Sequence, residues 1–230
     1  MKTIGLIGGL SWKSTAEYFR IINEEVKMRL GGFHSAKLVL YSVDFFEIEE
    51  MQRENRWEEA ARILSAAGRN VASAGADFAL ICANTMHKVF DEVQGELPIP
   101  LLHIVDAAAA SIKNARLKTV ALLGTKFTME GNFYIGRLSE KHGLAVIVPE
   151  KDDRDALHRI LYEELCLGTI QPESKKLLNS MIGRLQQRGA EGAILGCTEL
   201  PMLIHQHSSL PLFDTTALHA RAASELALKD

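Results

Sequence analysis

Runs of consecutive apolar residues alternate along the chain with stretches in which apolar residues recur at helical spacing. Apolar runs that end in glycine or polar residues are typical of strands buried on both faces of a parallel sheet. They predict strands at residues 2–9, 36–43, 76–83, 101–105, 118–124, 144–148 and 190–197. The helical spacing predicts helices over residues 57–74 and 172–188, and an earlier helix capped by Ser11 or Ser14. This alternation of strands and helices predicts an α/β fold.

The second half of the chain repeats the first at a nearly constant offset. Residues 118–124 match residues 2–8, residues 189–199 match 75–85, and residues 211–214 match 100–103. The repeat predicts two similar lobes related by a pseudo-two-fold duplication, each a parallel sheet flanked by helices. The predicted N-terminal lobe comprises residues 1–103 and 213–230, and the C-terminal lobe comprises residues 104–212. Because parallel sheets bind ligands at the carboxyl ends of their strands, we expect the active site in the cleft between the lobes.

The repeat pairs two strand ends that carry polar residues. It aligns Ala83 with Cys197, Asn84 with Thr198 and Thr85 with Glu199. A second thiol, Cys82, falls one position early, and since side chains alternate along a strand we expect it to point away from the face that Cys197 uses. A lone cysteine in an apolar strand is usually a packing residue. A thiol can also carry a proton, and the repeated polar exit favours this role for Cys197.

Charge and composition indicate a small solute as the partner. The formal net charge is -3, and the 26 Lys and Arg residues are scattered along the chain, so no basic patch is available for nucleic acid. No apolar stretch is long enough to cross a bilayer. The three cysteines form no CxxC pair, which favours a reducing compartment. We therefore expect a cytoplasmic protein, and since the histidines lack metal-binding spacing we expect no metal site.

The motif Gly-Cys-Thr-Glu at residues 196–199, together with Asn84, Thr85 and residues 8–12, resembles the motifs of the aspartate/glutamate racemase family. The resemblance covers nearly the whole chain. Segments 42–45, 83–88 and 163–168 look most similar to the enterobacterial amino-acid racemases of that family. The resemblance implies racemisation without a cofactor, by a two-base mechanism in which one residue removes the α-proton. A second residue, usually also a cysteine, returns a proton on the opposite face.

Carried over to this chain, the resemblance implies catalytic positions at residues 83 and 197. The implied substrate is an amino acid, with the dicarboxylic aspartate and glutamate favoured, whose carboxylates would be held by backbone amides and hydroxyls. Whether the chain forms a homodimer stays open. The residues implied to contact the substrate are Leu10, Gln52, Ala83, Asn84, Thr85, Thr198 and Glu199.

The chain departs from the family at Ala83, where the resemblance implies cysteine or, in the enterobacterial branch, threonine. Because a methyl group carries no proton, we interpret the chain as a racemase inactivated or weakened at this position, in which Cys197 still exchanges the α-hydrogen of one enantiomer. A branch using one thiol is the alternative. It would resemble the arylmalonate-type decarboxylases, in which a single cysteine protonates a carbanion opposite a small residue. A non-catalytic amino-acid-binding relative is a third interpretation.

Two further residues have more than one interpretation. Arg53 lies on a polar loop predicted at residues 47–56, where it could clamp a distal carboxylate or simply be solvated. Cys166 follows two glutamates and could be a packing residue or part of the substrate pocket.

Overall fold

The computed structural model describes residues 1–204, 206 and 209–229. Contacts within the chain divide it into two compact units: unit 1 comprises Met1–Ile104 and His219–Asp230, and unit 2 comprises Val105–Leu218. The predicted lobes differ from these units mainly over residues 213–218. The prediction places residues 213–218 in the first lobe, whereas the strand that ends at Asp214 pairs within unit 2.

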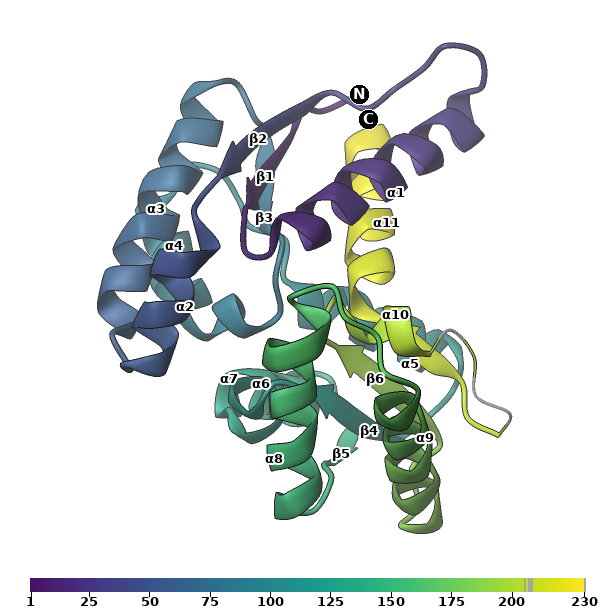
Figure 1. Ribbon diagram of the computed structural model, residues 1–230. Coiled ribbons are helices and arrows are strands. Elements are labelled where there is room, and N and C mark those ends of the chain that lie inside the picture. Colours follow the sequence, from purple (N-terminus) through teal and green to yellow (C-terminus); the bar gives the residue numbers. More distant parts are fainter. Residues whose placement is uncertain (205, 207–208, 230) are drawn as a thin grey trace. The chain divides into compact units, whose positions relative to one another are not determined.

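Unit 1 is built on a parallel sheet with the strand order β2-β1-β3. Its elements are β1 (Ile4–Gly8), α1 (Trp12–Leu30), β2 (Leu38–Ser42), α2 (Phe45–Arg53), α3 (Trp57–Ser73), β3 (Phe78–Ile81), the 3-10 segment η1 (Thr85–Val89), α4 (Phe90–Glu96) and most of α11 (Thr215–Leu228). In Figure 1, α1 lies on one face of this sheet and α3 and α4 lie on the other. A parallel bridge between Ala79 and Leu101 extends the sheet beyond β3.

The core of unit 1 forms because β1 and β3 are apolar on both faces. Every residue of these two strands is buried. Helix α3 turns small and aliphatic residues toward the sheet at helical spacing, among them Ala60, Leu64 and Ala67. The same cluster of buried side chains includes Leu10 and Ala83. The ends of β1 and β3 are therefore packed into the core.

The turn after β1 requires a glycine. Gly9 has a φ of 81°, and a Cβ on this residue would overlap the carbonyl oxygen of Val43. Its N–H donates to Thr15 Oγ1 at 2.8 Å. The turn is thereby held against both the exit of β2 and the first turn of α1.

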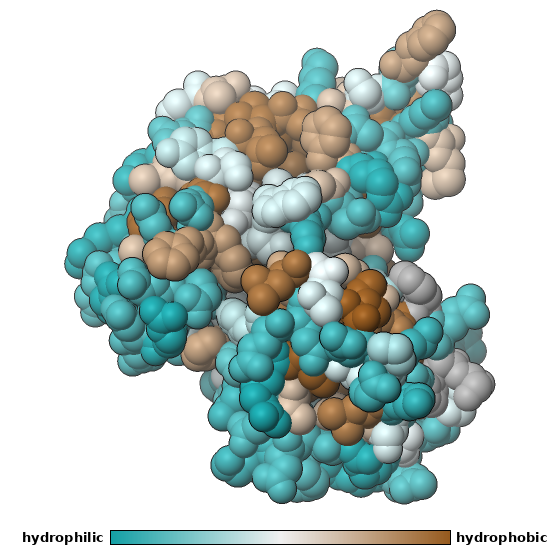
Figure 2. Space-filling view, in the orientation of Figure 1, coloured by the Kyte–Doolittle hydropathy of each residue, from teal (hydrophilic) through white to brown (hydrophobic). Residues whose placement is uncertain are grey.

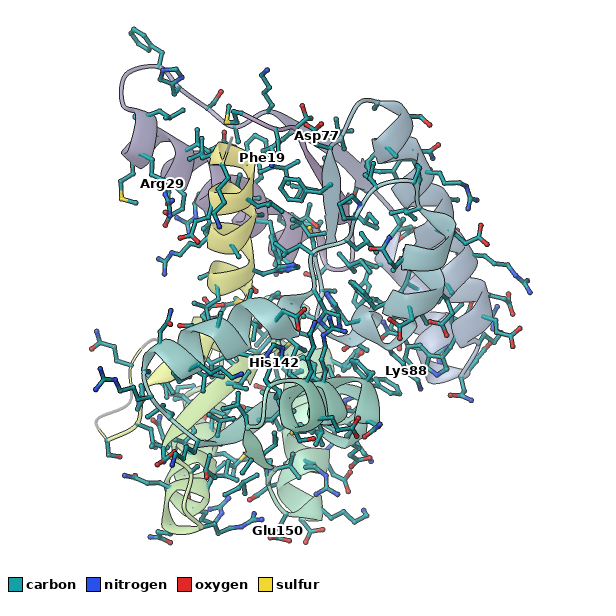
Figure 3. All side chains as sticks on the ribbon, turned by 180° about the vertical axis from the view of Figure 1, so that it is seen from behind. Phe19, Arg29, Asp77, Lys88, His142 and Glu150 are labelled. Atoms are coloured by element: carbon teal, nitrogen blue, oxygen red, sulfur yellow. The ribbon has the colours of Figure 1, made fainter. Side chains whose placement is uncertain are left out.

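Unit 2 is built on a four-stranded parallel sheet with the order β5-β4-β6-β7. Its elements are α5 (Ile104–Asn114), β4 (Thr119–Gly124), α6 (Lys126–Glu130), α7 (Asn132–Gly136), the π segment η2 (Arg137–Lys141), β5 (Ala145–Ile147), α8 (Lys151–Arg159), the π segment η3 (Ile160–Leu165), α9 (Pro172–Gln187), β6 (Gly192–Gly196), α10 (Leu200–Leu203) and β7 (Leu212–Asp214). Figures 1 and 3 show α8 and α9 on one face of this sheet and α5 on the other.

The strand registers of the two sheets repeat as the sequence does. Ile7 pairs with Ile81 in unit 1, and its counterpart Leu123 pairs with Leu195 in unit 2. Residues 83 and 197 each lie two positions beyond the second member of these pairs. The predicted α/β class, with two similar parallel sheets flanked by helices, is confirmed.

Two local predictions are wrong. The strand predicted at residues 101–105 is reduced to the bridge at Leu101, because α5 begins at Ile104. The polar stretch predicted as a loop at residues 47–56 instead contains most of α2. Asp44 caps this helix by accepting a hydrogen bond from the N–H of Phe46 at 3.0 Å, and the helix buries Ile48 and Gln52.

The surface of unit 1 carries exposed apolar side chains along the edge strand β2. Leu40 and Tyr41 are 46% and 42% exposed, and Figure 2 shows hydrophobic surface over this region. Among the described residues, no helix combines the length and the apolar character needed to cross a membrane.

Candidate active site

The end of β3 places Ala83 at the edge of the unit 1 core. The last ladder hydrogen bond runs from the N–H of Cys82 to the carbonyl of Ile7 at 2.9 Å, so the chain leaves the sheet at residue 83. Ala83 is 9% exposed and belongs to the same cluster as Leu10 and Met86. The position matches the predicted strand exit, but its side chain has no ionisable group.

Four of the predicted contact residues lie at the strand ends and helices of unit 1. Leu10 follows β1, Gln52 lies on α2, Asn84 precedes η1 and Thr85 begins it. All four are buried. Gln52 Nε2 donates to Met86 Sδ at 3.0 Å, so α2 reaches the segment that follows Ala83. Leu10 can offer only its backbone or an apolar surface to a ligand.

Cys82 is a core residue. Its side chain is fully buried, and burial raises the pKa of its thiol well above the ordinary value. Because the thiolate is the reactive form, a thiol kept protonated in an apolar core has little reactivity.

At the end of β6, two side chains donate hydrogen bonds to one carboxylate oxygen of Glu199. The strand ends at Gly196, where a Cβ would lie 2.9 Å from the carbonyl oxygen of Leu123, so only glycine allows β4 to approach this closely. The next residue, Cys197, donates its S–H to Glu199 Oε2 at 3.0 Å. Thr198 Oγ1 donates to the same oxygen at 2.6 Å. Three of the predicted site residues, Cys197, Thr198 and Glu199, are thus in direct contact.

The surroundings of Cys197 keep its thiol protonated. Burial has the largest effect and raises the pKa of the thiol well above its ordinary value, and the charges of Glu199 and Cys166 raise it further. A protonated thiol can donate a proton. It becomes a base more readily when a positive charge offsets the carboxylate beside it.

The second carboxylate oxygen of Glu199, Oε1, is buried and has no hydrogen-bond donor among the described residues. The residue is 4% exposed. Leaving a buried carboxylate oxygen unpaired costs free energy. An ammonium group would satisfy this oxygen, so Glu199 is suited to a positively charged ligand group.

Two cations near the predicted contacts in unit 1 are engaged at the surface. Arg53 is 61% exposed in its side chain and pairs with Glu49 at 3.4 Å and Glu50 at 3.9 Å. Lys88, labelled in Figure 3, holds its Nζ 3.9 Å from the centroid of the Trp57 ring. The carboxylate-clamp interpretation of Arg53 stays a prediction.

Cys166 follows η3 in unit 2. It lies close enough to Cys197 to influence the pKa of that thiol. The choice between a packing residue and a part of the substrate pocket stays a prediction for Cys166.

Two residues that were not predicted to serve the site contact the end of β3. Ser14 was expected as a helix cap, but its Oγ donates to the carbonyl of Cys82 at 2.8 Å. Ser11 occupies the cap position without a side-chain cap bond. His87 Nδ1 lies 2.8 Å from the carbonyl oxygen of Ala83. The only feature of the sequence that hints at this contact is the position of His87, four residues after Ala83.

No cluster of three or more His, Cys, Asp or Glu residues in the described part of the chain is placed to hold a metal ion.

Residues 7–223 match the family model described as Asp/Glu/Hydantoin racemase. The chain is 24% identical over 225 residues to the broad specificity amino-acid racemase RacX of Bacillus subtilis (strain 168), and the match covers 95% of each protein. It is similar over the full length of both chains to two solved structures. One is an Asp/Glu racemase homologue from Yersinia pestis, with 51% identity and a TM-score of 0.93. The other is an aspartate racemase homologue from Pyrococcus horikoshii OT3, with 38% identity and a TM-score of 0.86.

Proposed function

Since the chain belongs to the Asp/Glu/hydantoin racemase family, we propose that it uses Cys197 to move the α-proton of a dicarboxylic amino acid, aspartate or glutamate, without a cofactor. Family membership supports amino-acid racemase chemistry. The observation that carries the finer proposal is the hydrogen bond from Cys197 to the buried carboxylate of Glu199.

In the proposed reaction, residue 197 transfers a proton on one face of the substrate α-carbon, and residue 83 is the position that would transfer a proton on the opposite face. The thiolate of Cys197 takes the α-proton of one enantiomer, and the electron pair of the C–H bond remains on a planar carbanion. Return of a proton by Cys197 regenerates the same enantiomer. Inversion needs a proton from the other face, and Ala83 has none to give. The chain should therefore exchange the α-hydrogen of one enantiomer with solvent and racemise very slowly.

Glu199 is proposed to switch Cys197 between acid and base. In the free protein its negative charge raises the pKa of the thiol. A substrate ammonium group on Oε1 would offset that charge and favour the thiolate when substrate is bound. We propose that Asn84 and Thr85 hold the carboxylates of the substrate, and that Thr198, whose hydroxyl donates to Glu199, contributes its backbone N–H.

The proposal is tested by comparing the chain with its Ala83→Thr and Ala83→Cys variants. Each enantiomer of aspartate and glutamate is incubated in D2O, α-deuterium uptake is followed by NMR, and inversion is followed by chiral chromatography. We expect the Ala83 chain to exchange one enantiomer with retention, and the variants to racemise at least about 10²-fold faster than it does. Equal racemisation by all three chains would contradict the assignment of position 83. Binding without any exchange would instead support a non-catalytic relative.

A second candidate is decarboxylation of a disubstituted malonate. It is favoured by the combination of a protonated thiol at Cys197 with the small Ala83 side chain. One carboxylate would leave as CO2, its bonding electrons would remain on the α-carbon, and Cys197 would protonate the carbanion. Release of CO2 from an arylmalonate, without deuterium uptake by aspartate or glutamate, would favour this activity over the racemase half-reaction.

A further inference from the structure

Both peptide groups that flank the α-carbon of residue 83 are held by buried side chains. On the preceding side, Ser14 Oγ, from α1, donates to the carbonyl of Cys82 at 2.8 Å. On the following side, the ring of His87 contacts the carbonyl of Ala83 at 2.8 Å. Each of these two side chains is 2% exposed. Neither peptide group can therefore be reoriented by competing water without disrupting the core.

The hydrogen bonds of His87 fix the form of its ring. The backbone N–H of Ile104 donates to Nε2 at 3.2 Å, so that nitrogen carries no proton. The proton of the neutral ring is consequently on Nδ1, which donates to the carbonyl of Ala83. The ring thus ties position 83 to the first residue of α5.

This support matters because residue 83 has already left the sheet. The ladder ends with the bond from Cys82 to Ile7, and Asn84 is already in a helical conformation ahead of η1. The direction of the Cα–Cβ bond at residue 83 follows from the orientation of the peptide groups on its two sides. Fixing both carbonyls fixes that direction.

We propose that Ser14 and His87 are positioning residues that aim the side chain of residue 83 at the α-carbon of the substrate. This inference rests on the proposed function, since it concerns the second face of the same racemisation. Neither residue touches the reacting atoms. Their effect is geometric, and a misplacement of about 1 Å can lower a rate by about 10²-fold.

The test uses the Ala83→Thr chain as parent and measures the initial rate of α-deuterium loss from each labelled enantiomer. For the enantiomer that the Ala83 chain still exchanges, the rate of deuterium loss measures proton removal by Cys197. For the other enantiomer, it measures proton removal by residue 83. Adding Ser14→Ala or His87→Ala should lower the loss from the second enantiomer by about tenfold or more, and change the first by less than about twofold. His87→Gln keeps an amide donor and should recover part of the lost rate.

Two matched controls separate positioning from general damage. Ser224→Ala removes another buried serine whose hydroxyl donates to a backbone carbonyl, that of Ala220 at 3.0 Å. His158→Gln removes another partly buried imidazole, whose Nδ1 accepts a hydrogen bond from the N–H of Lys126 at 3.3 Å. Neither of these hydrogen bonds involves residue 83, so we expect no one-sided loss.

The enantiomer whose α-proton is removed by Cys197 also serves as an internal control for folding, because a misfolded variant would lose exchange of both enantiomers. If both enantiomers slow together, if neither slows, or if the controls produce the same one-sided loss, the positioning role is wrong. If the Ala83→Thr parent itself releases deuterium from only one enantiomer, the assignment of position 83 in the proposed function fails, and the positioning role fails with it.

Discussion

The ends of β3 and β6 occupy equivalent places in the two sheets, yet they are supported in different ways. At the β6 end, the side chain of Cys197 is held by Glu199 and Thr198, its own sequence neighbours. At the β3 end, the backbone around Ala83 is held by Ser14 and His87, which come from two other elements. The two equivalent strand ends therefore differ: at the end of β6 a neighbouring carboxylate holds the side chain, and at the end of β3 two buried side chains hold the backbone.

The largest effect that would break this comparison is loss of the thiol at residue 197. Cys197→Ala removes the only proton carrier in the proposed reaction, so α-hydrogen exchange should fall by about 10³-fold or more. Deuterium uptake by NMR measures it. Cys82→Ala is the matched control, because that thiol is fully buried at the other strand end. Persistent exchange in Cys197→Ala, or an equal loss in Cys82→Ala, would contradict the division of roles.

The next effect concerns the turns after β1 and β4. Gly9 has a φ of 81°, whereas Thr125, its counterpart in the repeat, has a φ of -66° and caps α6 by accepting from Thr128 N–H. Gly9→Ala forces a side chain into the left-handed region and against Val43, and should cost about 2 kcal/mol or more of unfolding free energy. Thr125→Gly should cost only about 0.5 kcal/mol. Urea unfolding of the two variants checks the asymmetry, and equal losses would contradict it.

The fold was predictable to the extent that its signals are local or repeated. Apolar runs identified the strands, and the repeat aligned Ala83 with Cys197, which lie at equivalent strand ends of the two sheets. Helix α2 was missed because only Ile48 and Gln52 are buried in an otherwise charged stretch. The apolar residues after Pro100 suit a strand or the start of a helix equally well. In the structure only Leu101 pairs with the sheet, and α5 begins at Ile104.

The chemistry of the site was predictable only in part. The cluster of Cys197, Thr198 and Glu199 could be predicted because its members are adjacent in sequence. The contact of Ser14 with Cys82 spans 68 positions, and no periodicity encodes it. The hydrogen bond from Ile104 to His87 depends on where α5 begins, and the apolar run at residues 101–105 does not reveal that start. Tertiary contacts of this kind can be identified only from coordinates.

A smaller effect would sharpen the electrostatic half of the comparison. The charge of Glu199 raises the pKa of the Cys197 thiol, so Glu199→Gln should lower that pKa. At pH 8, below the raised pKa, each unit of decrease gives about tenfold more thiolate. Alkylation of Cys197 by iodoacetamide, followed by peptide mass spectrometry, should accelerate accordingly. Glu150→Gln, also in unit 2 but with an 80% exposed side chain, is the control. An unchanged or slower rate in Glu199→Gln would show that the carboxylate does not govern the thiol.

The smallest effect compares the hydroxyl groups that hold a carbonyl near each strand end. Thr215 Oγ1 donates to the carbonyl of Leu195 at 2.8 Å, as Ser14 donates to that of Cys82. Removing either donor, by Thr215→Val or Ser14→Ala, should cost about 1 kcal/mol in urea unfolding. Because Glu199 holds the Cys197 side chain directly, Thr215→Val should leave alkylation of Cys197 within about twofold of the parent rate. A larger change would mean that the β6 end, too, depends on support from outside its own neighbours.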